Sequence, residues 1–243
     1  MSAAHAPLEP HGPIEPLFDD VWRVNGSLEM KPTMRLGRNM IVVRNGGELT
    51  IINSVRLDSG TEAQLKALGT IAHVVKIGLH GMDDAYYVDT FGAKMWTLPG
   101  ARVAEGVTAT DVLSADGDSA TPGSPIPDLT VFVFALTNKP EAALLLERHG
   151  GLLITCDSVQ HWEPSPRNSF TARIAFRLMG FMHPAQIGPP WLKAQTPAGG
   201  SARGDFDRLV ALPFRHVIGG HGGLLRDDGP ARLAETIHRV FGS

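Results

Sequence analysis

The chain has 243 residues, 43% of them hydrophobic and 19% charged, which is enough to bury a large core as one α/β domain. A formal net charge of −3 gives no basic surface for nucleic acid, and no apolar run reaches the ~18–20 residues of a membrane span. Neither a nucleic acid nor a membrane is therefore expected as a partner. The single cysteine, Cys156, excludes an intramolecular disulfide, and the N-terminus lacks a secretory pattern, so a cytoplasmic location is expected.

The N-terminal third is predicted to contain strands and one helix. Residues 1–16, with four prolines, are expected to be an irregular arm, and residues 17–243 to be one domain. A short strand is predicted over Asp20–Val24, and two apolar runs joined by Asn45-Gly46-Gly47 predict a β-hairpin. Ser59 and Glu62 have the spacing of a capping box, so they predict a helix that ends at Gly69. Strands are expected over 71–77 and 94–98.

The rest of the chain predicts a second sheet and more helices. A loop is expected over 115–128, a buried strand over 129–136, and a hairpin that turns at His149-Gly150-Gly151. Helices are expected near 170–181 and 201–212, a strand over 216–218, and a last helix from Pro230. This order indicates two hairpin-containing sheets with helices outside them.

Three of the predicted strands end in residues that bind metals. His80 and Asp84 follow one strand, Asp157 follows "LLITC", and His221 lies in "IGGHGG" after another. Strand ends are where binding groups gather in α/β proteins, and imidazole with carboxylate suits zinc, iron or manganese. Each residue also has a structural alternative: loop hydrogen bonds for the two histidines, and helix or turn capping for the two aspartates.

The order of these residues resembles the metallo-β-lactamase superfamily. The family motif H-x-H-x-D-H corresponds to His80-Gly81-Met82-Asp83-Asp84-Ala85, where the first histidine and the aspartate match. Asp157 corresponds to the bridging aspartate and His221 to the final histidine. The resemblance, which runs from about residue 20 to the C-terminus, implies a four-layer αββα sandwich with metal-binding loops at one edge of the sheets.

Three family histidines are replaced, by Met82, Ala85 and Asn138. Carried over residue by residue, one metal site keeps His80 and a share of Asp157. The other keeps Asp84, Asp157 and His221. The resemblance therefore implies one divalent ion, zinc first and iron or manganese as alternatives, rather than a pair. His161, four residues after Asp157, is either a replacement ligand or a residue that packs in the pocket.

The segment from Phe170 to Trp191 carries an apolar stripe that forms core, a lid over the site, or a homodimer contact. The leading hypothesis is a metal-dependent hydrolase that acts on a small ester, lactone or thioester-like molecule. His80, Asp84 and Asp157 would be catalytic, and His80, Asp84, Asp157, His221 and His161 would be the metal ligands. Two alternatives stay open: a non-catalytic binding protein that holds no metal, and an iron oxidoreductase.

Overall fold

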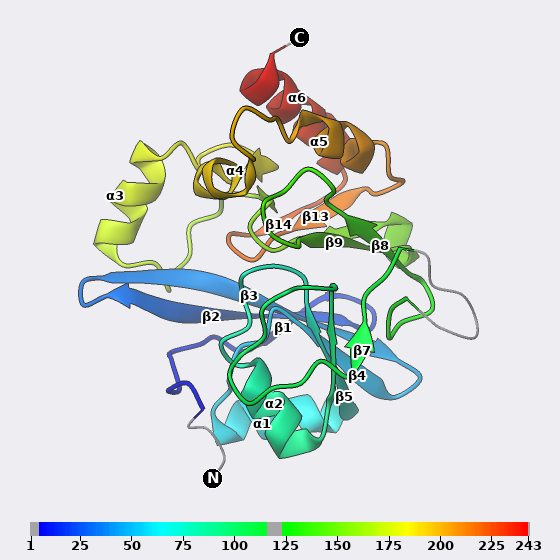
Figure 1. The fold of residues 1–243 in the computed structure, drawn as a ribbon. Helices are drawn as coiled ribbons and strands as arrows, with labels where there is room; N and C mark the ends of the chain where they lie inside the picture. Colours follow the sequence, from blue (N-terminus) through cyan, green and yellow to red (C-terminus); the bar gives the residue numbers. More distant parts are fainter. Residues whose placement is uncertain (1–4, 116–122, 243) are drawn as a thin grey trace.

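Two β-sheets packed face to face, with helices on both outer surfaces, make up the computed structural model of the protein (Figure 1). The structure describes residues 5–115 and 123–242. Helices α1 and α2 lie against one sheet, and α4, α5 and α6 lie against the other, while α3 stands to one side beyond the ends of β2 and β3. This arrangement is the four-layer αββα sandwich that was expected.

The first sheet has seven strands in sequential order, and its first three pairings are antiparallel. The expected turn at Asn45-Gly46-Gly47 joins β3 to β4, with both glycines at positive φ (58° and 94°), where a side chain would be strained. The strands are β1 (Ile14–Phe18), β2 (Val21–Lys31), β3 (Met34–Asn45), β4 (Glu48–Ile52), β5 (Thr70–Lys76), β6 (Lys94–Thr97) and β7 (Asp111–Val112).

The second sheet has the order β14-β13-β10-β9-β8, and a separate two-stranded ladder joins β11 to β12. The predicted second hairpin is present, because β9 and β10 pair antiparallel around His149-Gly150-Gly151. β13 pairs in parallel with β10, so the loops after both strands leave at the same edge. The strands are β8 (Leu129–Val133), β9 (Ala142–Leu146), β10 (Leu152–Ile154), β11 (Val159–Gln160), β12 (Gln186–Ile187), β13 (His216–Ile218) and β14 (Leu224–Leu225).

The helices cover the sheets through their apolar faces. Leu65 of α1 and Tyr87 of α2 pack in the core beneath the first sheet, and Phe206 of α5 and Leu233 of α6 pack above the second. The helices are α1 (Ser59–Leu68), α2 (Asp84–Phe91), α3 (Phe170–Leu178), α4 (Pro189–Gln195), α5 (Arg203–Val210) and α6 (Gly229–Phe241), with a 3₁₀ turn η1 (Arg148–Gly150). Within the described part of the chain, no helix has the length and hydrophobicity to cross a bilayer.

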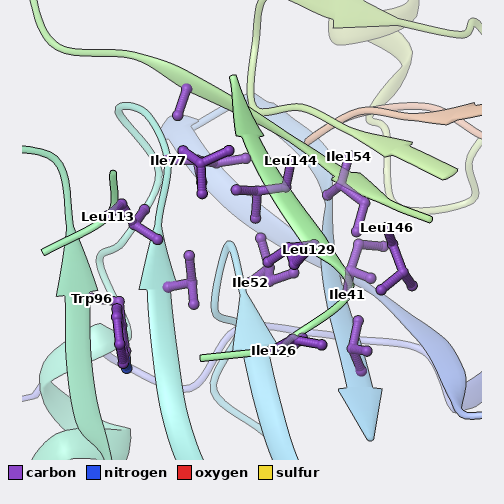
Figure 2. Packing of buried hydrophobic residues seen from close by; sticks show 14 of the residues in the cluster. Ile41, Ile52, Ile77, Trp96, Leu113, Ile126, Leu129, Leu144, Leu146 and Ile154 are labelled. Atoms are coloured by element: carbon purple, nitrogen blue, oxygen red, sulfur yellow. The ribbon is translucent and has the colours of Figure 1, made fainter. Parts of the chain in front are cut away.

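The main hydrophobic core lies between the two sheets. Figure 2 shows Ile41 and Ile52 of the first sheet meeting Leu144 and Ile154 of the second, all fully buried. Side chains alternate along each strand, so the other side of every strand is free to pack against the helices. The loops that carry the candidate site are therefore attached to two rigid sheets.

Several predicted boundaries differ from the structure for identifiable reasons. The predicted Ser59–Glu62 capping box is wrong: Asp58, one residue earlier, is the N-cap and accepts a hydrogen bond from the Thr61 amide (2.8 Å). β1 begins at Ile14, inside the segment expected to be irregular, and the strand predicted from Asp20 extends to Lys31. Helix α4 begins with prolines at its first two positions, where no intrahelical N–H is needed. Part of the loop expected over 115–128, residues 116–122, lies outside the described residues.

Candidate metal centre

His80 lies in the loop that follows β5 and is buried. Lys76, the last residue of β5, donates through its Nζ to the backbone oxygen of His80 and so fixes the loop to the strand. His80 Nδ1 is buried without a hydrogen-bond partner, while Nε2 lies 3.4 Å from Asp157 Oδ1. Burial lowers the pKa of this imidazole, which favours the neutral form that binds metals.

Asp157, directly after β10, is where the two histidines meet. Its Oδ1 lies 3.4 Å from His80 Nε2 and 3.2 Å from His221 Nε2. Gln160 Nε2 donates to the same oxygen at 3.3 Å. Burial works against ionisation of this carboxyl, but the neighbouring His80 and His221 outweigh it and hold its pKa well below the usual range.

The tautomer of His221 follows from its second hydrogen bond. Its Nδ1 lies 2.6 Å from the backbone oxygen of Gly37, a group that only accepts, so Nδ1 carries a proton. In the neutral ring Nε2 then holds a lone pair, and it faces the anionic Asp157. Burial disfavours the charged imidazole, but the hydrogen bond that the protonated Nε2 donates to Asp157 outweighs it and raises the pKa of His221. The pair therefore requires a positive charge between them, either a proton or a metal ion.

The loop that carries His221 is fixed from the first sheet. Asn39 of β3 donates through Nδ2 to the backbone oxygens of Gly219 (2.9 Å) and Gly222 (3.0 Å), and its amide donates to that of Gly220 (2.7 Å). A Cβ at Gly220 would lie 2.9 Å from His80 Cε1, so glycine is required for the two histidine loops to approach. Sequence analysis did not identify Asn39, although it is a polar residue at the start of the apolar run of β3.

One ligand atom each from His80, Asp157 and His221 lies within 4.8 Å of the others. Ligands at ~2.1 Å around a tetrahedral ion are roughly 3.4 Å apart, close to the 3.2 and 3.4 Å separations found here. Two imidazoles and a carboxylate are also a common donor set for zinc and non-haem iron. The residues present therefore fit one divalent ion.

Asp84 takes a different position from these three residues. It begins α2 and is fully buried, with Oδ1 accepting from Ser54 Oγ at 2.6 Å. Its Oδ2 has no hydrogen-bond partner, and a side chain at Gly81 would overlap both this oxygen and Lys76 Nζ. Burial raises the pKa of Asp84. The carboxylate thus faces the ammonium group of Lys76, outside the group formed by His80, Asp157 and His221.

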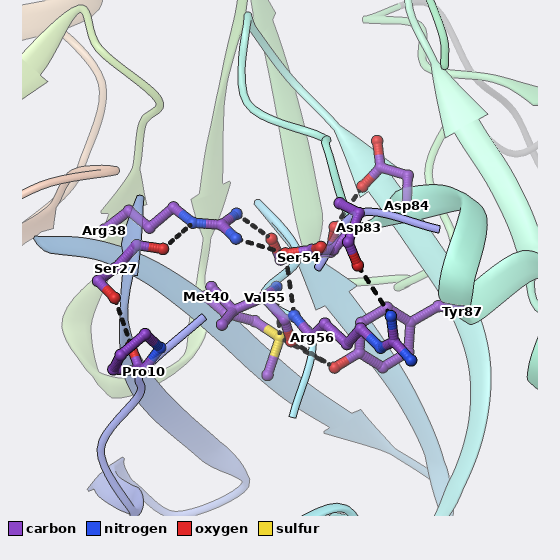
Figure 3. Close-up of polar contacts among 11 residues, drawn as sticks. Pro10, Ser27, Arg38, Met40, Ser54, Val55, Arg56, Asp83, Asp84 and Tyr87 are labelled. Carbon is purple, nitrogen blue, oxygen red and sulfur yellow. Dashed lines mark hydrogen bonds and ion pairs between the residues drawn. The ribbon is translucent and has the colours of Figure 1, made fainter. Parts of the chain in front are cut away.

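Figure 3 shows the buried polar contacts behind Asp84. Arg38 forms an ion pair with Asp83, and its Nη1 donates to the backbone oxygen of Ser54 (2.8 Å). The Arg56 amide also donates to Asp83 Oδ2 (3.0 Å). These contacts connect β3, the segment after β4 and the start of α2, so they hold the loop of His80 in place.

The candidate ligand His161 and the replaced family position Asn138 are both outside the group of three. His161 borders a small pocket with Trp162 and Gly37, and its Nδ1 is buried without a partner. It does not belong to the group of three. Asn138 donates through Nδ2 to the backbone oxygens of Ala194 (3.0 Å) and Thr196 (3.2 Å), so it holds the end of α4.

A fully buried carboxyl, Glu141, lies behind the site and was missed by sequence analysis. A Cβ built at Gly78 would be 2.6 Å from Glu141 Oε2 and 2.7 Å from Cys156 Cβ. The Glu141 side chain is therefore buried between the His80 loop and the end of β10. Both oxygens lack a hydrogen-bond partner in the structure. Burial raises the pKa of Glu141 well above its usual range. No local pattern marks such a residue, because Glu141 stands alone directly before the apolar strand β9.

A cavity of about 590 Å³ opens over the three residues and is mainly apolar. His80, Asp157, His221 and Gln160 form its polar end. The remaining wall comes from β2, β3, α3 and α4 and includes four methionines, Met30, Met34, Met82 and Met179. Its volume lies within the ~300–1,000 Å³ range of small-molecule sites, and methionine adapts to ligands of different shape. Below, this cavity is called the chamber.

No protein-family model and no curated protein sequence matches the chain. Several solved structures match it in fold. A metallo-β-lactamase from Erythrobacter litoralis aligns with a TM-score of 0.61 at 12% identity, covering 93% of this chain and 92% of its own. The chain has the metallo-β-lactamase fold. VMB-1 aligns with a TM-score of 0.63 at 14% identity (92% and 94% covered). The mono-zinc form of FIM-1 from Pseudomonas aeruginosa aligns at 0.59 and 14% (94% and 96% covered).

The metallo-β-lactamase fold explains why the three residues converge. The loops after β5, β10 and β13 all open at one edge of the sandwich, although they belong to two different sheets. Met82, at a position where the family motif has histidine, contributes a thioether to the chamber wall instead. Ala85, at another such position, lies in the first turn of α2.

Proposed function

We propose that the chain is a metal-dependent hydrolase with one divalent ion, which acts on a small ester, lactone or thioester-like substrate. The observation that supports it is the approach of His80 Nε2 and His221 Nε2 to Asp157 Oδ1, at 3.4 and 3.2 Å. His80, Asp157 and His221 would hold the ion. Zinc is the first candidate, with iron and manganese as alternatives. The mono-zinc state of FIM-1 shows that this fold accommodates a single ion.

Bound there, the ion would lower the pKa of a water molecule and polarise a carbonyl oxygen. The remaining functions fall to residues of the chain. Gly37 holds the His221 ring through Nδ1, so that Nε2 points to the centre. Gln160 orients the Asp157 carboxylate. The apolar chamber excludes water from the rest of the substrate and favours a substrate with an apolar group.

Asp84 and His161 stay predictions within this proposal. The Oδ2 oxygen of Asp84 has no hydrogen-bond partner, but the carboxyl group faces Lys76. Lys76 also donates to the backbone of His80, so Asp84 would affect catalysis by positioning the His80 loop. His161 lines a small pocket together with His221 but is outside the group of three. Asp84 is tested beside Asp157 below.

Metal analysis of protein purified without a histidine tag tests the proposal. We expect about one equivalent of zinc, iron or manganese, and hydrolysis of simple esters or lactones that is lost on chelation and restored by the metal. Asp157→Ala and His221→Ala should lose both metal and activity while their circular dichroism stays unchanged. His238→Ala, an exposed histidine on α6, is the matched control and should keep both.

The second candidate function is a binding protein that uses the same chamber without a metal. It is favoured by one observation: Asn138 stands at a family ligand position, and its Nδ2 group donates to two backbone oxygens at the end of α4. Absence of metal after supplementation with zinc, iron and manganese would support this candidate against the hydrolase.

A further inference from the structure

The outer surface of α3 carries three large apolar side chains that are exposed. Phe170, Ile174 and Leu178 are spaced by four residues, so they share one face, and they are 76%, 45% and 83% exposed. Arg173 and Arg177 are exposed beside them. On the opposite side of the helix, Ala172 and Phe176 are buried against Phe181. The exposed residues Phe170, Arg173, Ile174, Arg177 and Leu178 are called the α3 face.

The α3 face continues onto the turn between β2 and β3. Ser169, the N-cap of α3, accepts from the Arg35 amide (3.2 Å), and Thr171 Oγ1 donates to the backbone oxygen of Thr33. At this turn Met30 is 56% exposed and Lys31 is exposed next to it. The end of the hairpin and α3 project together from one side of the molecule (Figure 1).

The charged side chains of the α3 face, Arg173 and Arg177, are both positive. Residues 164–204, which include α3, contain no aspartate or glutamate, in a chain whose net charge is −3. Glu29, at the hairpin end, is acidic and pairs in register with Arg35. Apolar side chains flanked by arginines on one helix are typical of helices that lie in the interface of an anionic lipid bilayer.

We propose that the α3 face and the end of the β2–β3 hairpin bind the surface of an anionic lipid bilayer. Phe170, Ile174 and Leu178 enter the boundary between headgroups and acyl chains, and Arg173 and Arg177 contact the lipid phosphates. A second copy of the chain is disfavoured as the occupant. A symmetric contact through this face would place Arg173 and Arg177 against their own copies, with no acidic residue on the face to compensate.

The chamber lies directly behind this surface. Ala175, Phe176 and Met179 of α3 form part of its wall, and so does Met30 of the hairpin. The surface bound to lipid is therefore the one that borders the apolar cavity. Binding to lipid does not depend on hydrolysis, so it can be measured without substrate. A negative result for lipid binding would therefore leave the proposed hydrolase function untouched.

Flotation of the full-length protein with phosphatidylcholine vesicles, with and without phosphatidylglycerol, is the test. We expect flotation with the anionic vesicles that weakens as salt rises. Phe170→Ser and Leu178→Ser should each weaken the apparent affinity about tenfold or more, and Arg177→Gln about fivefold. Val112→Ser and Arg102→Gln are matched controls, since both residues are exposed on the other half of the sandwich.

Three results would overturn the proposal. The first is an absence of flotation with phosphatidylglycerol vesicles at low salt. The second is flotation that Phe170→Ser, Leu178→Ser and Arg177→Gln reduce no more than the controls do. The third is a dimer, measured by light scattering, that Leu178→Ser converts to a monomer, because a second copy of the chain would then cover the face.

Discussion

Asp157 Oδ1 lies 3.4 and 3.2 Å from two imidazole nitrogens, and the two histidines follow strands of different sheets. The His80 loop follows β5 of the first sheet, and His221 follows β13 of the second. With the carboxylate ionised and His221 favouring a proton, the structure balances its charges at Asp157 without an ion. A metal bound at this position would displace that proton, so its affinity should fall in acid.

Asp84 and Asp157 provide a direct test of the ligand set at the scale of single residues. Asp157→Asn should lower zinc affinity more than about 100-fold, because it removes a charged ligand at the centre. Asp84→Asn should change zinc affinity less than about tenfold, because this carboxyl faces Lys76 and Ser54. Competition with a chromophoric chelator measures both. Equal losses in the two variants would return Asp84 to the ligand set expected from sequence.

The order of strand ends placed His80, Asp157 and His221 among the candidates, together with Asp84, which lies outside their group. Each follows an apolar run directly, and apolar runs mark strands well. The surroundings of Asp84 could not be predicted in this way, because Ser54 and Lys76 reach it from other strands. Glu141 and Asn39 were missed for the same reason: both act between elements, and neither belongs to a local motif.

The N-cap of α3 makes hydrogen bonds both within the helix and to β3, while the helix itself buries Ala172 and Phe176. Ser169 Oγ accepts from the Ala172 amide (3.3 Å) and from the Arg35 amide of β3 (3.2 Å). Ser169→Ala should destabilise the helix by about 1 kcal/mol. Hydrogen exchange should therefore accelerate in residues 170–178. Ser201→Ala, which removes a similar contact before α5, should leave exchange in α3 unchanged.

Most elements followed from sequence because their signals are local. The two hairpins turn at glycines with positive φ, and α6 has proline at its start and a regular apolar stripe. No helix was predicted over α4, although the first turn of a helix accepts Pro189 and Pro190. The two-residue strands β7, β11, β12 and β14 are too short to be predicted from sequence and are defined by their pairing with another strand.

The two sheets share one core, so the sandwich should unfold as a unit. Leu144 of β9 is fully buried between the sheets, and Leu144→Ala should lower the free energy of unfolding by about 2–5 kcal/mol. Urea unfolding followed by fluorescence and by circular dichroism should remain a single transition. Val112→Ala, at an exposed position of β7, should change the free energy by less than about 0.5 kcal/mol.

Arg148 connects the sheets at the edge away from the metal centre. It donates to Asp128 (2.6 and 2.7 Å) and to the backbone oxygen of Arg44 in β3 (3.0 Å). The hydrogen bond from Arg148 lowers the pKa of Asp128 below the ordinary value. The pair therefore stabilises the fold above the unfolded pKa of about 3.9, and this contribution is lost as pH falls through the folded pKa.

Asp128→Asn should thus cost less than about 1 kcal/mol at neutral pH, because the pair is partly exposed. The difference from the unmodified protein should shrink toward zero below about pH 4. Urea unfolding across this range measures it. A difference that stays constant with pH would mean that Asp128 contributes through packing rather than charge.

The connection that Asn39 makes to residues 219–222 has a consequence for biosynthesis. His80 and Asp157 leave the ribosome well before His221, yet the loop of His221 adopts its shape only against β3, which is made early in translation. A nascent chain therefore has His80 and Asp157 without His221 until its last segment has returned to one of its first strands. In the proposed hydrolase, loading of an ion would be a step that follows synthesis.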